Sequence, residues 1–130
     1  MIGGLVVSAD IALRNSLISG NSAKHNPDIG LYLGFGLLSG DHNFIGVPGV
    51  AGQLPDTLSG DPLLGPLADN GGPTLTHAID RNSPARDVGS NPLGLAFDQR
   101  GPGFLRSLHA TDIGAFEYQN LTIFADGFDP

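Results

Sequence analysis

The sequence predicts an all-β fold with many turns, and three observations carry that prediction. Twenty glycines and ten prolines punctuate the 130 residues at short intervals. Between them lie runs of three to five apolar or β-branched residues, which is the length and composition of short strands. No window repeats apolar residues at i, i+3, i+4 and i+7 for more than about two turns, so few helices are expected.

The densest pattern of turn signals runs from Leu67 to Tyr118. It contains four short sequence motifs in this order: L-A-D-N-G-G-P-T-L-T-H-A, N-S-P-A-R-D-V-G, D-Q-R-G and D-I-G-A-F-E. Short runs such as Thr74–Thr76 and Ile113–Phe116 separate the turns and are strand candidates.

With these four motifs the segment resembles the C-terminal module of bacterial surface proteins of the choice-of-anchor Q type. The family usually reads S-P-A-I-D-x-G, and here Arg86 stands in place of the apolar residue. The resemblance implies a right-handed parallel β-helix, a pectin-lyase-like solenoid, of which this chain supplies the last coils and a C-terminal cap. It also implies an extracellular or bacterial cell-surface location, with the export signal expected upstream of this chain.

The first 66 residues are interpreted as terminal coils with inserted loops. Leu5–Val7, Ile11–Leu13 and Leu17–Ile18 are short strand candidates, and Asn43 with Phe44–Ile45 repeats the last of them one coil later. Stacked coils would lie about 4.8 Å apart. Asn15 and Asn43 are then expected at stacked corners, where their amides would form an Asn ladder that satisfies buried polar groups.

The rest of the chain divides into two further parts. Residues 67–119 are predicted to form an irregular last coil and the cap, because terminal repeats of solenoids must cover apolar stacking surface and strand edges. Residues 120–130 form a tail that resembles short C-terminal tails of exported proteobacterial proteins. The tail is expected to dock on the cap or to act as a recognition tag.

Charge excludes several classes of partner. The chain carries a net charge of −7 with only six Lys plus Arg, and neither half is basic. Neither a nucleic acid nor an anionic membrane surface is therefore expected to bind. No apolar run is long enough to span a bilayer, and no charged segment followed by an apolar one marks a signal peptide. An acidic, cysteine-free, lysine-poor surface suits an extracellular bacterial protein.

No catalytic residues and no metal site are predicted. Lyases of this fold use acidic Ca²⁺ ligands and a base, and the nearest equivalents here would be Asp41, His42, Arg14 and Lys24. These residues lack the spacing of a Ca²⁺ loop. The histidines at 25, 42, 77 and 109 lack zinc-ligand spacing, and His77 is expected to hydrogen-bond to backbone at the cap. No serine lies in a G-x-S-x-G context.

The charged residues of the module are the candidate site: Asp98, Arg100, Asp112 and Glu117. One interpretation is a Ca²⁺ or ligand pocket built by carboxylates from two loops. The favoured interpretation is a structural clamp, in which the planar Arg100 guanidinium donates a bidentate pair to a carboxylate and ties two glycine-rich loops together. Because an arginine repels a metal ion, no cofactor is expected, and Ca²⁺ remains the alternative.

The predicted function is a non-enzymatic structural and cap segment of an exported, adhesin-like β-helix protein. One alternative is the C-terminal part of a polysaccharide lyase or hydrolase-like enzyme with its catalytic coils upstream. Another is a carbohydrate-binding surface for glycans. The expected partners are upstream coils of its own full-length chain, and the isolated fragment is expected to self-associate through uncovered strand edges.

Overall fold

The computed structural model describes residues 5–7, 9–31 and 36–119, so the predicted tail at 120–130 lies outside the described residues. Within these ranges the chain consists mainly of short strands in small sheets with one short helix, which confirms the all-β prediction. The elements are β1 (Leu5–Val7), β2 (Ile11–Arg14), β3 (Leu17–Ile18), β4 (Ile29–Leu31), β5 (Leu38–Asp41), β6 (Phe44–Ile45), the 3₁₀ helix η1 (Gly49–Gln53), β7 (Leu64–Ala68) and β8 (Thr76–Ile79).

The first six strands form three parallel pairs, β1–β4, β2–β5 and β3–β6. Paired residues lie 24 positions apart in the first pair, as Leu5 with Ile29, and 27 apart in the second, as Ile11 with Leu38. The third pair places Leu17 beside Phe44 and Ile18 beside Ile45, which confirms the predicted parallel pairing of these residues. Two successive turns of the chain therefore run side by side, strand on strand.

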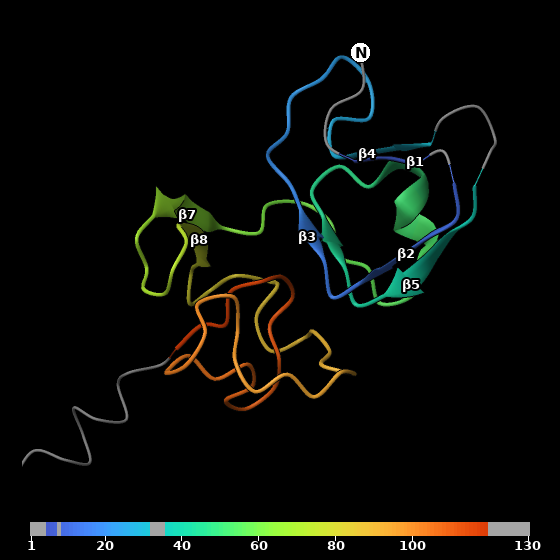
Figure 1. The fold of residues 1–130 in the computed structure, drawn as a ribbon. Coiled ribbons are helices and arrows are strands. Elements are labelled where there is room, and N and C mark those ends of the chain that lie inside the picture. Colours follow the sequence, from blue (N-terminus) through green and yellow to red (C-terminus); the bar gives the residue numbers. More distant parts are fainter. Residues whose placement is uncertain (1–4, 8, 32–35, 120–130) are drawn as a thin grey trace, which may run out of the picture.

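A small apolar core lies between the three strand pairs. Figure 1 shows the pairs on three sides of an enclosed space, with η1 inside that outline. Leu13, Ile29 and Ile45 are buried there together with Ala51 of η1. The helix is held by bonds from the Ala51 N–H to the Pro48 carbonyl and from the Leu54 N–H to the Ala51 carbonyl. Helix η1 thus completes the core between the strand pairs.

A repeated corner conformation fixes how the two turns of chain are aligned. Asn15 and His42 have φ angles of 49° and 52° and occupy equivalent positions, directly after the paired residues Arg14 and Asp41. Asn and His tolerate this left-handed region better than most residues. The repeat of 27 residues makes Asn43 the equivalent of Ser16, so Asn15 and Asn43, which are 28 apart, are not stacked corner partners.

The module after the coils contains a hairpin and then mostly turns. β7 and β8 pair in antiparallel fashion with an irregularity between Leu64 and Leu67, and β7 crosses the boundary expected at residue 66. From residue 80 to 119 the described chain forms turns and one isolated bridge, between Phe97 and Leu105. The strand expected at 113–116 is absent from these described residues.

The module lies beside strands β3 and β6. Phe44 and Ile45 are neighbours in β6 and point to opposite faces, as successive strand residues do. Ile45 faces the inner core, whereas Phe44 packs with Ala85 and Ile113 of the module and with Leu17. Figure 1 shows this yellow-to-red segment next to β3. The predicted module therefore packs against the outward side of β3 and β6 through Phe44 and Leu17.

Candidate functional site

The Arg100 and Asp98 side chains form a buried ion pair. Nη2 of Arg100 lies 2.6 Å from Oδ2 of Asp98, and Nε lies 3.0 Å from the same oxygen and 3.2 Å from Oδ1. The two side chains are only 4% and 0% exposed. Asp98 also accepts the backbone N–H groups of Arg100 and Glu117. A carboxylate this deeply buried needs such donors to offset the loss of its hydration.

Arg100 also joins segments that are distant in the sequence. Its Nη2 donates to the Glu117 carbonyl at 2.7 Å, and its Nη1 lies 3.4 Å from the Asn70 carbonyl. The guanidinium lies between two aromatic rings, 4.0 Å from the centroid of Phe104 and 3.8 Å from that of Phe116. A planar delocalised cation suits this stacked position, whereas a lysine ammonium does not. One side chain therefore links the loops around residues 70, 98–104 and 116–117.

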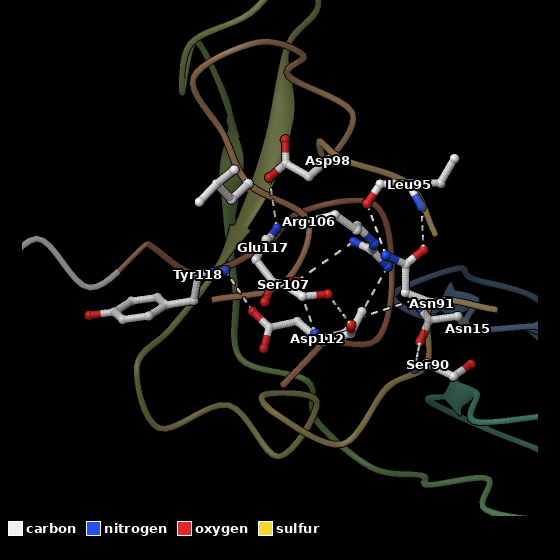
Figure 2. Close-up of polar contacts among 12 residues, drawn as sticks. Asn15, Ser90, Asn91, Leu95, Asp98, Arg106, Ser107, Asp112, Glu117 and Tyr118 are labelled. Carbon is white, nitrogen blue, oxygen red and sulfur yellow. Dashed lines mark hydrogen bonds and ion pairs between the residues drawn. The ribbon is translucent and has the colours of Figure 1, made fainter. Parts of the chain in front are cut away.

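Asp112 and Glu117 belong to an adjacent cluster, in which Arg106 lies beside the Glu117 carboxyl group. The Asp112 carboxylate accepts the N–H groups of Asp87 at 2.8 Å and of Tyr118 at 2.6 Å. Glu117 Oε2 accepts the Asp112 N–H at 3.0 Å and lies 3.9 Å from Arg106 Nη1. Figure 2 shows these groups converging on the chain between residues 106 and 118. The four predicted residues are thus neighbours, linked by the bond from the Glu117 N–H to Asp98.

Burial changes the acidity of this second pair. It raises the pKa of Glu117 to about 7, against the opposing effects of the Asp112 N–H bond and the Arg106 charge. Burial also raises the pKa of Asp112, although the N–H groups of Tyr118 and Asp87 favour its charged form. Removing a carboxylate from water disfavours its ionised form, which is the physical cause of both shifts.

The Asn15 and Asn43 amides bond to backbone groups. Asn43 is fully buried, donates to the Leu13 carbonyl at 3.0 Å and accepts the Ser16 N–H at 3.1 Å. Asn15 reaches the module instead, donating to the Asp112 carbonyl at 3.1 Å and accepting the Ser90 N–H at 2.8 Å. In the described residues the two amides do not bond to each other, so the expected ladder is replaced by two separate backbone links.

Three of the residues considered for lyase chemistry meet at an exposed corner. His42 Nδ1 lies 2.7 Å from Asp41 Oδ1, and Arg14 Nε lies 3.8 Å from Asp41 Oδ2. The described residues place no ion pair between Lys24 and this corner, and they contain no group of three or more His, Asp or Glu arranged to hold a metal. His77 donates from Nδ1 to the Gly65 carbonyl at 2.8 Å, the backbone contact that was predicted.

Arg106 is the site residue that sequence reasoning missed. It lies in the segment F-L-R-S-L-H, which contains no turn signal and belongs to none of the four motifs. The sequence holds no signal that distinguishes it from a surface arginine, because the burial of Asp112 and Glu117 is visible only in the structure. Only the fold shows that Arg106, 6% exposed, lies beside them.

Two hollows border these clusters. A cavity of about 850 Å³ lies between the β7–β8 hairpin, β3 and residues 113–116, and its lining includes Leu17, Leu67, Leu75, Ile79, Ile113 and Phe116. A second, of about 480 Å³, lies between the corner at Arg14–Asn15 and the loop that runs from Ser90 to Phe97. Both volumes fall within the range of small-ligand pockets.

Fold and site together define a strand-rich all-β chain whose irregular module is held by buried charge clusters. Comparisons with protein-family models, with curated proteins and with solved structures found no match to this chain. In the part of the chain that the structure describes, no helix has the length and apolar character needed to cross a membrane.

Proposed function

We propose that this chain is a non-enzymatic structural segment at the C-terminal end of a right-handed parallel β-helix, in an exported, surface-displayed and adhesin-like protein. The observation that carries the proposal is the set of three parallel strand pairs with repeats of 24 and 27 residues. In a solenoid each repeat contacts its neighbours along one axis, so equivalent strands pair in order. A bridge between Phe44 and Leu58 continues this parallel order on the far edge of β6.

The edge of β2 supports the presence of further coils. The Ile11 N–H donates to the Leu37 carbonyl, so the alternation of a parallel ladder directs the Ala12 N–H and carbonyl away from β5. In the described residues β2 pairs with β5 alone. An uncovered strand edge is a template for another strand, and upstream coils of the full-length chain are the partner that we propose for it.

The contacts made by the buried charged side chains support a structural role. Asp98 and Arg100 are saturated by each other, by backbone groups and by aromatic rings. Such groups hold loops together and leave no reactive atom facing solvent. The acidic, cysteine-free composition supports the proposed location outside the cell.

Two alternatives rest on specific features. One is a polysaccharide lyase or hydrolase-like enzyme whose catalytic coils lie upstream and to which this chain adds the Arg14–Asp41–His42 corner, where a cation, a carboxylate and an imidazole meet. The 850 Å³ cavity, with Phe116, Gln99 and His77 in its lining, favours a surface that binds glycans. Cleavage of polygalacturonate by the full-length product in the presence of Ca²⁺ supports the enzyme. Retention on glycans without turnover supports the binding surface.

Sedimentation velocity over a range of concentrations tests the proposed edge. We expect the chain to self-associate, and we expect Ala12→Pro to reduce that association because proline removes the outward N–H without breaking the β2–β5 ladder. Ala12→Val keeps the N–H and is the matched control, which should associate like the wild-type chain. A monomer at all concentrations, or equal association of the proline and valine variants, would contradict the proposal.

A further inference from the structure

The module contacts both coils, the first with β1–β3 and the second with β4–β6, through consecutive residues. Ile113 packs with Phe44 of the second coil and with Leu17, which is the partner of Phe44 in the first coil. Gly114 meets the first coil, since its N–H donates to the Asn15 carbonyl at 3.1 Å and a Cβ on it would lie 3.0 Å from the Leu17 Cβ. The chain from 113 to 114 therefore runs from the second coil toward the first.

Beyond that contact the module becomes exposed. Ile113 is 1% exposed and Gly114 is half-buried, whereas Ala115 is exposed and belongs to the lining of the 480 Å³ hollow. The coils contribute Arg14 and Asn15 to the described lining of this hollow, and both belong to the first coil. This order indicates that the hollow lies on the side of the first coil that faces away from the second.

One wall of the hollow is an apolar loop that is anchored to the first coil. The Ser90 N–H donates to Asn15 Oδ1 at 2.8 Å, and the Asn91 side chain donates to the Leu95 carbonyl and accepts its N–H, both at 2.9 Å (Figure 2). The loop presents three exposed apolar side chains to the hollow, Leu93 (82%), Leu95 (53%) and Phe97 (39%). Exposed apolar side chains on a braced loop indicate a contact surface.

The free edge of β2 lies on the same side of the first coil. The Ala12 N–H and carbonyl point away from β5, and Arg14 at the end of β2 lines the hollow. A strand added in parallel to β2 would lie about 4.8 Å from it. If its chain turned the corner as the described coils do, it would pass Asn15 and enter the hollow. A strand edge and an apolar loop thus form one continuous surface.

We propose that Leu93, Leu95 and Phe97 are a docking surface for the coil that precedes β1 in the full-length protein. An apolar side chain of that coil, at the position equivalent to Leu17 and Phe44, lies against them. Repeats of a solenoid place equivalent residues in line, so the row that already contacts the module continues into the hollow. The inference rests on the proposed function, because it requires that upstream coil. The module then braces three successive coils from one side.

Thiol labelling tests the docking surface, because the chain contains no cysteine. Leu95→Cys places a thiol on the surface, and Leu75→Cys, at a leucine of similar exposure (55% against 53%) in the other hollow, is the matched control. Both variants should fold, because both leucine side chains are exposed. Each is labelled in the 130-residue chain, at a concentration where sedimentation shows a monomer, and in the full-length product. Mass spectrometry of the peptide that carries the new thiol gives the rate.

We expect Leu95→Cys to be labelled at least roughly tenfold more slowly in the full-length product than in the isolated chain, because the covering coil must first open. Leu75→Cys should be labelled at the same rate in both. Slowing that occurs in the isolated chain as its concentration rises, and not in the full-length product, would assign the surface to a second copy of the chain and overturn the inference.

Amide hydrogen exchange at Ala12 in the full-length product separates this inference from the proposed function. Slow exchange at Ala12, with equal labelling of Leu95→Cys in both proteins, would overturn the docking surface and leave the upstream coils standing. Fast exchange at Ala12 together with fast labelling would overturn both. Slow labelling without protection of Ala12 would mean that something other than a coil covers the loop, which would also overturn the inference.

Discussion

At the scale of single residues, the Arg100 guanidinium bonds to Asp98 and to the Glu117 carbonyl and stacks between Phe104 and Phe116. Such side-chain contacts matter here because residues 80–119 form almost no backbone ladder within the described chain. The turns in this segment are joined by side chains that bond to backbone, as Asp112 bonds to the N–H groups of Asp87 and Tyr118. Loss of one buried charge should therefore loosen several turns together.

Arg100→Ala is expected to lower the free energy of unfolding by about 3–5 kcal/mol, because it leaves the buried Asp98 carboxylate without its cation. Urea denaturation followed by circular dichroism measures the change. Arg81→Ala, at an exposed arginine of the same module, should stay within about 0.5 kcal/mol of the wild type. Equal stability of both variants would show that the buried pair does not hold the module.

The raised pKa of the Glu117 carboxyl group predicts that the stability of the fold depends on pH. Its pKa is raised from an ordinary 4.5 to about 7 in the folded chain. Between these values the folded state holds a proton that the unfolded state has released, so the free energy of unfolding falls as the pH rises through that window. The slope from this group is at most about 1.4 kcal/mol per pH unit.

The comparison of wild type with Glu117→Gln isolates that contribution. The variant keeps an oxygen for the Asp112 N–H but cannot titrate, so its stability should depend less on pH between about 4.5 and 7. Urea midpoints at several pH values in this window provide the measurement. Parallel pH profiles for the two proteins would show that Glu117 does not titrate there.

At the scale of elements, the parallel pairs depend on close approach of two backbones. Gly40 in β5 has a φ of 120°, and a Cβ at this position would lie 1.7 Å from the Leu13 carbonyl oxygen of β2. Asn43 adds a side-chain bond to the same carbonyl. The β2–β5 pair therefore requires glycine at 40, and the adjacent corner requires residues that accept a positive φ.

Gly40→Ala is expected to disrupt the β2–β5 pair, because both the backbone conformation and the clash with Leu13 oppose a side chain there. Amide hydrogen exchange should show loss of protection in β2 and β5. Gly52→Ala in η1 meets only ordinary contacts with Pro48 at 3.5 Å and should keep wild-type protection. Retained protection in the Gly40 variant would contradict the register.

At the scale of the whole molecule, the coils and the module are joined at Asn15. Its amide bonds to Asp112 and Ser90, its carbonyl accepts the Gly114 N–H at 3.1 Å, and Leu17 packs with Ile113 nearby. Polar and apolar contacts thus meet along one side of β3. Because both parts share this junction, they should unfold as one cooperative unit.

Asn15→Gly is expected to weaken that junction without strain, since glycine accepts the φ of 49° but loses both amide bonds. We expect a loss of roughly 1–3 kcal/mol and a broadened or split calorimetric transition. Asn26→Gly, at an exposed asparagine with a φ of 45°, is the matched control and should melt as the wild type does. A single sharp transition at the wild-type temperature in the Asn15 variant would indicate that the junction contributes little.

The sequence by itself determined the local features of this protein. Glycine and proline spacing predicted short strands, and strand candidates such as Leu17–Ile18 and Phe44–Ile45 were found and correctly paired. These strand predictions succeed because turn residues and runs of β-branched residues determine the backbone conformation over only a few positions. The two motifs D-Q-R-G and D-I-G-A-F-E also indicated which charged residues would lie near one another.

Only the tertiary structure decided which cation serves which carboxylate and where the module lies. Arg106 beside Glu117, Asn15 against Asp112 and Phe44 against Ile113 join residues that are 11, 97 and 69 positions apart. A one-residue difference in repeat length made Asn43 the partner of Ser16 instead of Asn15, and spacing in the sequence does not resolve it. Long-range burial sets these contacts, because the side chains are neutralised and bonded only once the loops have packed.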